Sequence, residues 1–133
     1  MMGLYRLRKK ERLSGKKRIE KLFQEGISVY CFPFRVVWLL SDRISGNSLA
    51  RITIAVSRKN FRNAVDRNLI KRRIREAYRR NKYILTEWLD KDSLTLDVAF
   101  IYTASQILSY RDIEEKIIVA LHKIIEVNEK VTD

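Results

Sequence analysis

The sequence predicts an α+β domain in which helices pack on a sheet of about four strands. A length of 133 residues suffices for one domain with a hydrophobic core, spanning residues 1–133, and is short for two. Residues 64–81 contain no proline or glycine and are rich in strong helix formers. Residues 49–57 and 94–103 have the β-branched and apolar character of strands. The predicted order of elements is α-β-β-β-α-β-α, with the first two strands forming a hairpin or one bent strand.

The first predicted helix is KKRIEKLFQE at residues 16–25. Ser14 can cap its N-terminus, and Gly26 is placed to end it in the left-handed conformation. Residues 1–13 form a basic segment in front of this helix, and we expect that segment to be flexible.

Three strand regions are predicted. Residues 27–40 are rich in aromatic and β-branched residues, and Pro33 marks an edge or a bulge there because it lacks a ladder donor. Alternation in residues 49–57 separates two faces, with Ile52, Ile54 and Val56 inward and Arg51, Thr53 and Ser57 outward. Residues 94–103 are almost continuously apolar. This predicts an interior strand, parallel to the preceding strand if the helix between them is the crossover.

Aromatic side chains gather on the first helix and the first strands. Two apolar faces are predicted: Ile19, Leu22 and Phe23 on the helix, and Phe32, Phe34, Val36 and Trp38 on the strands. Most residues of this kind belong to the core. RNA-binding sheets, however, use the same residue types to stack on bases, so Phe34 or Phe23 could instead line a groove.

The helix predicted for residues 64–81 has two different sides. Ile70, Ile74 and Ala77 fall on one narrow stripe that can face a core. A neighbouring arc of about 140° collects Arg67, Asn68, Lys71, Arg72, Arg75 and Arg79. Solvated helices usually mix both signs of charge at i,i+4 spacing, whereas like charges at that spacing repel. A polyphosphate partner would reverse the repulsion, which favours a binding face over a merely solvated one.

The positive charge of the chain is concentrated rather than spread. The formal net charge is +12, from 28 Lys and Arg against 16 Asp and Glu. Residues 57–82 contain eleven of these basic residues and two acidic residues. Residues 1–21 contain nine basic residues and two acidic residues. Localised charge of this kind indicates a binding surface for nucleic acid or another acidic partner.

The last predicted helix begins at Ser109, which forms a capping-box-like S-x-x-D with Asp112, and extends to about residue 129. Its apolar stripe consists of Ile113, Ile117, Ala120, Leu121 and Ile124. The single histidine, His122, has no plausible catalytic partner nearby in sequence, and we expect it to be structural or exposed.

Several functional classes are disfavoured. The sequence shows no zinc spacing, phosphate loop or nucleophile motif, so no catalytic and no metal-binding residues are predicted. Asp90, Asp92 and Asp97 are close in sequence but are better explained as solubilising charge. The single Cys31 cannot form an internal disulfide, and the longest apolar run, residues 36–40, is too short to span a bilayer. We therefore expect a cytoplasmic protein with no membrane partner and no small-molecule substrate.

The basic stretch resembles the signature of one known family, the protein component of bacterial ribonuclease P. That signature is a strand ending V-S-[KR]-[KR], followed by a helix with the pattern A-V-x-R-N-R-x-K-R-x-x-R-E-x-[FY]-R. The chain matches it at Val56, Ser57, Arg58, Lys59, Ala64, Val65, Arg67, Asn68, Lys71, Arg72, Arg75, Glu76, Tyr78 and Arg79. Phe23 and Gly26 match an F-x-x-G in the first helix of the family, so the resemblance covers about residues 5–127.

The resemblance implies both a function and a fold. Members of the family bind a large catalytic RNA, and that RNA with its magnesium ions removes the 5′ leader from precursor tRNA. We therefore expect a non-catalytic subunit that binds the ribonuclease P RNA, 1:1, and precursor tRNA, with Mg²⁺ held mainly by the RNA. The implied fold is a small α/β sandwich with a left-handed βαβ crossover, similar to a domain of a small-subunit ribosomal protein.

Two groups of site residues are expected on this basis. Contacts to the RNA subunit are predicted for Arg58, Lys59, Arg62, Asn63, Arg67, Asn68, Lys71, Arg72, Arg75 and Arg79. Binding of the single-stranded leader is predicted for Phe23, Phe34, Val36 and Arg51. Leu69 departs from the family, which usually has arginine there, and residues 60–62 replace a shorter glycine-containing turn. The alternative is a ribosomal or other nucleic-acid-binding module without a role in tRNA processing.

Overall fold

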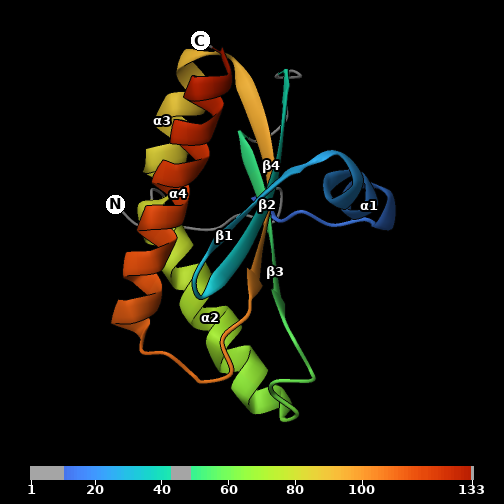
Figure 1. Ribbon diagram of the computed structural model, residues 1–133, viewed down its shortest axis with the longest axis vertical. Helices are drawn as coiled ribbons and strands as arrows, with labels where there is room; N and C mark the ends of the chain where they lie inside the picture. The colour runs from blue at the N-terminus through green and yellow to red at the C-terminus, as the bar shows by residue number, and fades with distance from the viewer. Residues whose placement is uncertain (1–10, 43–48, 133) are drawn as a thin grey trace.

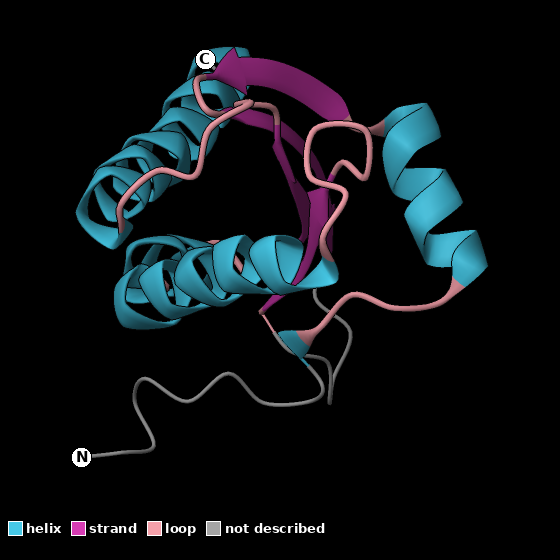
Figure 2. Cartoon of the chain, turned by 90° about the horizontal axis from the view of Figure 1, so that it is seen from below, coloured by secondary structure: helices cyan, strands magenta, loops and turns pink. Residues whose placement is uncertain are grey.

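A four-stranded sheet separates one helix from three others in the computed structural model, which describes residues 11–42 and 49–132 (Figure 1). The elements are α1 (Lys16–Glu25), β1 (Ile27–Cys31), β2 (Phe34–Asp42), β3 (Ala50–Val56), α2 (Ala64–Asn81), α3 (Tyr83–Lys91), β4 (Leu94–Tyr102) and α4 (Tyr110–Thr132). α1 lies alone against one face of the sheet, and the other three helices cover the opposite face (Figure 2). The predicted α+β arrangement is confirmed, with one additional helix.

The strands lie in the order β1-β2-β4-β3. β1 pairs with β2, and β2 with β4, in antiparallel register, whereas β3 runs parallel to β4. Parallel neighbours need a long crossover connection, which α2 and α3 provide. The predicted interior position of residues 94–103, and their parallel pairing with the preceding strand, are thus confirmed. A single residue, Lys82, separates the two crossover helices.

The main core lies between the sheet and the three helices that cover it. The predicted inward stripe of α2, Ile70, Ile74 and Ala77, is fully buried there, and so is the predicted stripe of α4. On the sheet, the rings of Phe34 and Phe100 meet edge to face with centroids 6.1 Å apart. Burying one large apolar side chain contributes about 1.5–3 kcal/mol. The buried stripe therefore fixes α2 in rotation about its axis and leaves its opposite side to solvent.

β1 and β2 form a hairpin rather than one bent strand. Cys31 pairs with Phe34, and Phe32 and Pro33, joined by a cis peptide bond, make the turn between them. Phe32 is exposed at this turn. The prediction that it shares the inward face of β2 is therefore wrong, because the turn interrupts the strand alternation.

The ends of α1 also differ from the prediction. Gly15, with φ of 97°, occupies the N-cap position and no side chain caps the helix, so the cap predicted for Ser14 is wrong. Gly26 has φ of −75° and is extended, so it does not end the helix in the left-handed conformation. Close packing explains this glycine instead. A Cβ there would lie 2.4 Å from the carbonyl oxygen of Leu22 and 2.9 Å from that of Trp38.

The N-cap predicted for the last helix is confirmed. The Ser109 hydroxyl oxygen accepts a hydrogen bond from the backbone N–H of Asp112 at 3.1 Å. α4 continues to Thr132, a little beyond the predicted end, and His122 is exposed on it.

Residues 11–13 are held against the domain, although the sequence places them in a flexible segment. The Leu13 N–H donates to the carbonyl oxygen of Ile52 in β3 at 2.6 Å, and the Leu13 side chain is buried. The Glu11 carboxylate pairs with the Lys82 ammonium at 3.0 Å, where α2 meets α3. The predicted flexibility is wrong for these residues, and residues 1–10 lie outside the described part of the chain.

Candidate nucleic-acid interface

The outward side of α2 presents a group of polar and basic side chains, Asn68, Lys71, Arg72 and Arg75, here called the basic face. Asn68 and Arg72 are exposed, and Lys71 and Arg75 are half-buried beside β3. At the entrance to the helix the predicted residues Arg58, Lys59, Arg62 and Asn63 are exposed. Among the described residues, no acidic side chain forms an ion pair with any cation of these two groups. Their positive charge therefore remains available to an anionic partner.

Arg67 shapes the loop that leads into α2. Its Nη1 donates hydrogen bonds to the carbonyl oxygens of Phe61 and Arg62, both at 2.8 Å. Phe61 is itself buried, with its ring centroid 6.0 Å from that of Tyr102. The departure from the family pattern at residues 60–62 thus contributes a core anchor. These contacts anchor the backbone of the loop that carries the exposed cations.

Arg79 is engaged in an ion pair within α2. Its guanidinium donates to both carboxylate oxygens of Glu76, with Nε 3.0 Å from Oε2. These hydrogen bonds lower the pKa of Glu76 and raise the pKa of Arg79. Arg67 and Arg79 thus lie on the polar arc of α2 that the helical period predicts, but both already have partners within the chain.

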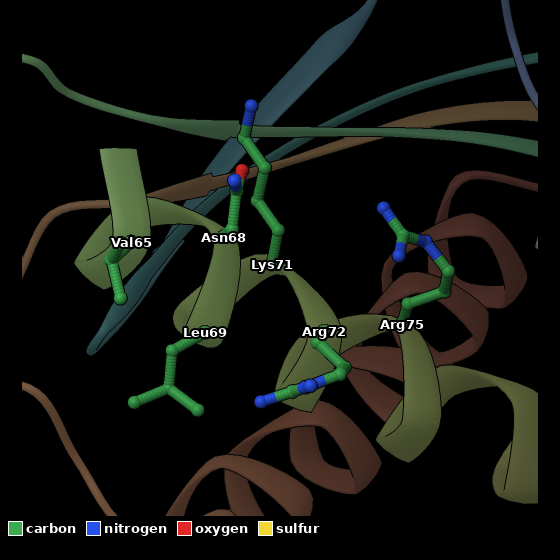
Figure 3. Close-up of a pocket in the computed structure, with 6 residues that line it drawn as sticks. All are labelled: Val65, Asn68, Leu69, Lys71, Arg72 and Arg75. Carbon is green, nitrogen blue, oxygen red and sulfur yellow. The ribbon is translucent and has the colours of Figure 1, made fainter.

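Two adjoining hollows lie along the basic face. The first has a volume of about 530 Å³ and is lined by Val65, Asn68, Leu69, Lys71, Arg72 and Arg75 (Figure 3). The second, of about 280 Å³, is lined by Arg12, Ser14, Thr53, Lys71 and Arg75 among others. Because Lys71 and Arg75 line both hollows, the polar surface continues from α2 to the N-terminal segment.

The sequence did not single out Arg12 or Ser14 as site residues. A parallel backbone bridge between Arg12 and Ile52 places the N-terminal segment alongside β3, next to α2. The concentration of Lys and Arg in residues 1–21 was the only feature of the sequence that pointed to a binding role for this segment. The contact between Arg12 and the edge strand β3 is a tertiary contact, and the spacing of residues along the sequence does not predict it.

Two of the predicted leader contacts are wrong. Phe34 is 0% exposed and Val36 is 2% exposed, because both point into the main core. A side chain with no accessible surface cannot stack on a nucleobase. Alternation along a strand separates the two faces correctly but does not show which face the helices cover.

The accessible face of the sheet is the one beside α1. Phe23 projects from α1 with 49% of its surface exposed, and Tyr30 on β1 is 63% exposed. The strand register aligns one row across the sheet, here called the open row: Tyr30, Arg35, Ile101 and Ala55. None of these four residues is buried. α1 packs instead over the adjacent row, where Val37 and Ala99 are buried.

Arg51 lies on this same face, as its predicted outward orientation requires. Its Nε is 2.9 Å from Oδ1 of Asp97, and both side chains are mostly buried. The pair joins β3 to β4 and neutralises the charge at that end of the face. A leader contact by Arg51 would therefore have to compete with Asp97 for the guanidinium.

The described residues do not assemble a metal centre. They contain no group of three or more His, Cys, Asp or Glu side chains that could hold a metal ion. Burial raises the pKa of the Tyr78 hydroxyl, which lies in the core and stays protonated. In the part of the chain that the structure describes, no helix has the length and apolar character needed to cross a membrane.

An α+β fold with a one-sided basic helix is typical of a nucleic-acid-binding protein. The protein family described as Ribonuclease P matches residues 7–125 of this chain. The ribonuclease P protein component of Porphyromonas gingivalis is 36% identical over 110 residues, which cover 81% of this chain and 78% of that protein. The corresponding protein of Petrotoga mobilis is 41% identical over 75 residues, which cover 56% of this chain and 59% of that protein.

Solved structures have the same fold. The RNase P protein of Staphylococcus aureus superposes with a TM-score of 0.66 at 26% identity, covering 88% of this chain and 96% of that chain. The RNase P protein from Thermotoga maritima gives a TM-score of 0.66 at 26% identity, covering 85% of this chain and 96% of that chain. The chain therefore belongs to the ribonuclease P protein family, as its signature predicts. It is a component of a ribonucleoprotein of tRNA processing, which implies an RNA partner.

Proposed function

We propose that this chain binds the catalytic RNA subunit of ribonuclease P and the 5′ leader of precursor tRNA, and so promotes removal of the leader to give the mature tRNA 5′ end. Family membership supports the class of partner. The observation that supports the mode of binding is the unpaired cationic surface made by the basic face of α2 and the loop before it.

The RNA subunit would lie along α2. Cations spaced along a rigid helix can neutralise successive phosphates and release their counterions, which gives affinity without reading sequence. Lys71 and Arg75 form the wall shared by the two hollows, so an RNA backbone that follows the helix would also approach Arg12. Binding of this kind should weaken steeply as salt is raised.

The leader would lie on the open row beside α1. Tyr30 offers a ring for stacking on an unpaired base, and Arg35 in the same row offers a cation for the backbone. Phe23 is exposed on α1, the helix that packs over the adjacent row. These residues take the place of Phe34 and Val36, and they sit on the face of the sheet that only one helix partly covers.

Hydrolysis would be carried out by the RNA subunit, with Mg²⁺ activating water and stabilising the leaving oxygen. The described protein residues provide no carboxylate cluster for such ions, so we assign them no step of the chemistry. Their part is to hold substrate and RNA subunit together, in a 1:1 complex, by reducing the repulsion between two polyanions.

Reconstitution at low magnesium tests this proposal. The protein is added to a ribonuclease P RNA, and leader removal from precursor tRNA is measured with and without it. We expect cleavage only when the RNA is present, and faster cleavage with the protein. A variant with Lys71, Arg72 and Arg75 all replaced by alanine serves as the matched control and should stimulate far less. No stimulation by the wild type would favour a nucleic-acid-binding module with another role, and cleavage without RNA would show a protein nuclease.

A further inference from the structure

Two aliphatic side chains, Val65 and Leu69, lie among the basic residues of α2, and phosphate binding does not explain them. They are here called the apolar step. Val65 is 78% exposed, and Leu69, about one helical turn later, is half-buried. Both line the first hollow, together with the basic face. Aliphatic side chains cannot donate hydrogen bonds to a phosphate, so their place among cations calls for a different kind of contact.

The side chains around this hollow are of three chemical kinds. In Figure 3, Val65, Leu69 and Arg72 project to one side of the helix, and Asn68 and Lys71 project toward the neighbouring strand. The hollow thus has an aliphatic part, an amide with both a donor and an acceptor, and guanidinium and ammonium groups around them. A volume of about 530 Å³ lies within the range of small-ligand sites and leaves room for one planar ring system.

An unpaired nucleobase matches all three kinds of side chain. Its faces are apolar enough to rest on Val65 and Leu69. Its edge carries donors and acceptors that the amide of Asn68 can pair with. The phosphates on either side of the base are the groups that Lys71 and Arg75 would hold.

We infer that this hollow receives a single unstacked nucleobase of the bound RNA subunit, seated on Val65 and Leu69. The inference rests on the proposed function and deepens it, because it adds one base contact to a surface otherwise expected to meet only phosphates. The base must come from a loop, bulge or strand end, since bases within a helix are stacked and cannot enter. A protein partner is disfavoured because the apolar step is surrounded by unpaired cations on a chain of net charge +12.

The salt dependence of RNA binding separates a base contact from a phosphate contact. Leu69→Ala removes aliphatic surface but no charge, so the dissociation constant should rise about fivefold at every salt concentration with an unchanged slope. Arg72→Ala should raise the dissociation constant and also flatten the slope. Alanine is the strongest helix former, so Leu69→Ala should keep α2 folded. Val65→Ala, at an exposed position, provides a second variant with the same expected signature, and Val119→Ala on the exposed side of α4 is the control.

Chemical probing of the unpaired bases of the RNA identifies the occupant. We expect one base to be protected by the wild type and by Val119→Ala, and to regain reactivity with Leu69→Ala. Removing that base from the RNA should then weaken wild-type binding about as much as Leu69→Ala does, and the two changes together should weaken it little further.

Two outcomes overturn the inference and can be told apart. If the wild type binds the RNA, and Leu69→Ala and Val65→Ala match it in affinity and in protected bases, the hollow holds no base and only this inference fails. If the wild type does not bind the RNA, the proposed function fails as well.

Discussion

Two aromatic residues on neighbouring strands show how position decides the role of a side chain. Phe34 lies in the core, with its ring centroid 6.1 Å from that of Phe100 and 5.9 Å from that of Tyr102. Tyr30 lies on the other face of the sheet with most of its surface exposed. Both are aromatic residues that favour strands, so only the register and the placement of the helices distinguish the buried ring from the exposed one.

Phe34→Ala should lower the free energy of unfolding by about 3–5 kcal/mol, because it leaves a cavity among packed rings. Urea unfolding measures this loss. Since Phe34 has no exposed surface, the folded variant should bind precursor tRNA and mature tRNA with proportionate changes in affinity. A selective loss of affinity for the leader-bearing substrate would contradict its assignment to the core.

Tyr30→Ala should behave in the opposite way. Its ring is exposed, so we expect little change in stability, but the affinity of the holoenzyme for leader-bearing substrate should fall by about 1–3 kcal/mol, the usual range for losing one stacked base. Mature tRNA, which lacks the leader, should bind as before. Tyr30→Phe keeps the ring and is the matched control, and an equal loss for both substrates would count against the open row as the leader site.

At the level of elements, α2 was predicted more completely than the sheet. A 3.6-residue period locates the buried stripe and the polar arc from spacing alone, and both are found where the sequence places them. The wheel cannot show that Arg67 bonds loop carbonyls or that Arg79 pairs with Glu76, because these depend on rotamers and on the loop.

The sheet shows a second limit of sequence information. A period of two assigns each residue of β2 to one of two faces, but only tertiary packing decides which face receives three helices and which receives α1. Phe34 and Val36, predicted to bind the leader, therefore lie on the face that the three helices cover. The charged residue Arg35 lies on the other face of the same strand. A charged side chain indicates the more exposed face, so Arg35 could have located the open row.

Within α2, the unpaired and the paired arginine should differ in their effect on RNA binding. Arg72→Ala should reduce the slope of log affinity against log salt by about 0.9, the value for losing one phosphate contact. Arg79→Ala should change that slope less, because the charge of Arg79 is already balanced by Glu76. Binding titrations over a range of KCl concentrations measure both slopes. Equal slopes for the two variants would show that the ion pair opens when RNA binds.

In the whole molecule the two proposed RNA surfaces meet at β3. Ile52 and Thr53 belong to the second hollow next to α2, while Ala55 of the same strand lies in the open row on the α1 side. β3 is the last strand of the sheet, so no further strand separates these surfaces. Substrate and RNA subunit would therefore bind on either side of the β3 edge of the sheet, next to each other.

Two N-terminal deletions of different length should separate the contribution of positive charge to RNA binding from the contribution of residues 11–13 to stability. Deleting residues 1–10 removes four basic residues and leaves every described contact of the domain in place. The salt slope of RNA binding should fall by about 0.9 for each phosphate contact that is lost. Deleting residues 1–15 also removes the Leu13 bond to Ile52 and the Glu11 pair with Lys82, so this longer deletion should lower the urea midpoint. A stable and fully active product of the longer deletion would contradict the structural role of residues 11–13.

Residues 11–13 also cover part of the outer edge of β3. β3 is an outer strand, and unpaired N–H and C=O groups on such a strand can pair with another molecule and start aggregation. The Leu13 N–H occupies the Ile52 carbonyl, and the adjacent Arg12 places a positive charge at the same edge. We expect this backbone bond and this charge to hinder edge-to-edge pairing between free molecules at this point of β3.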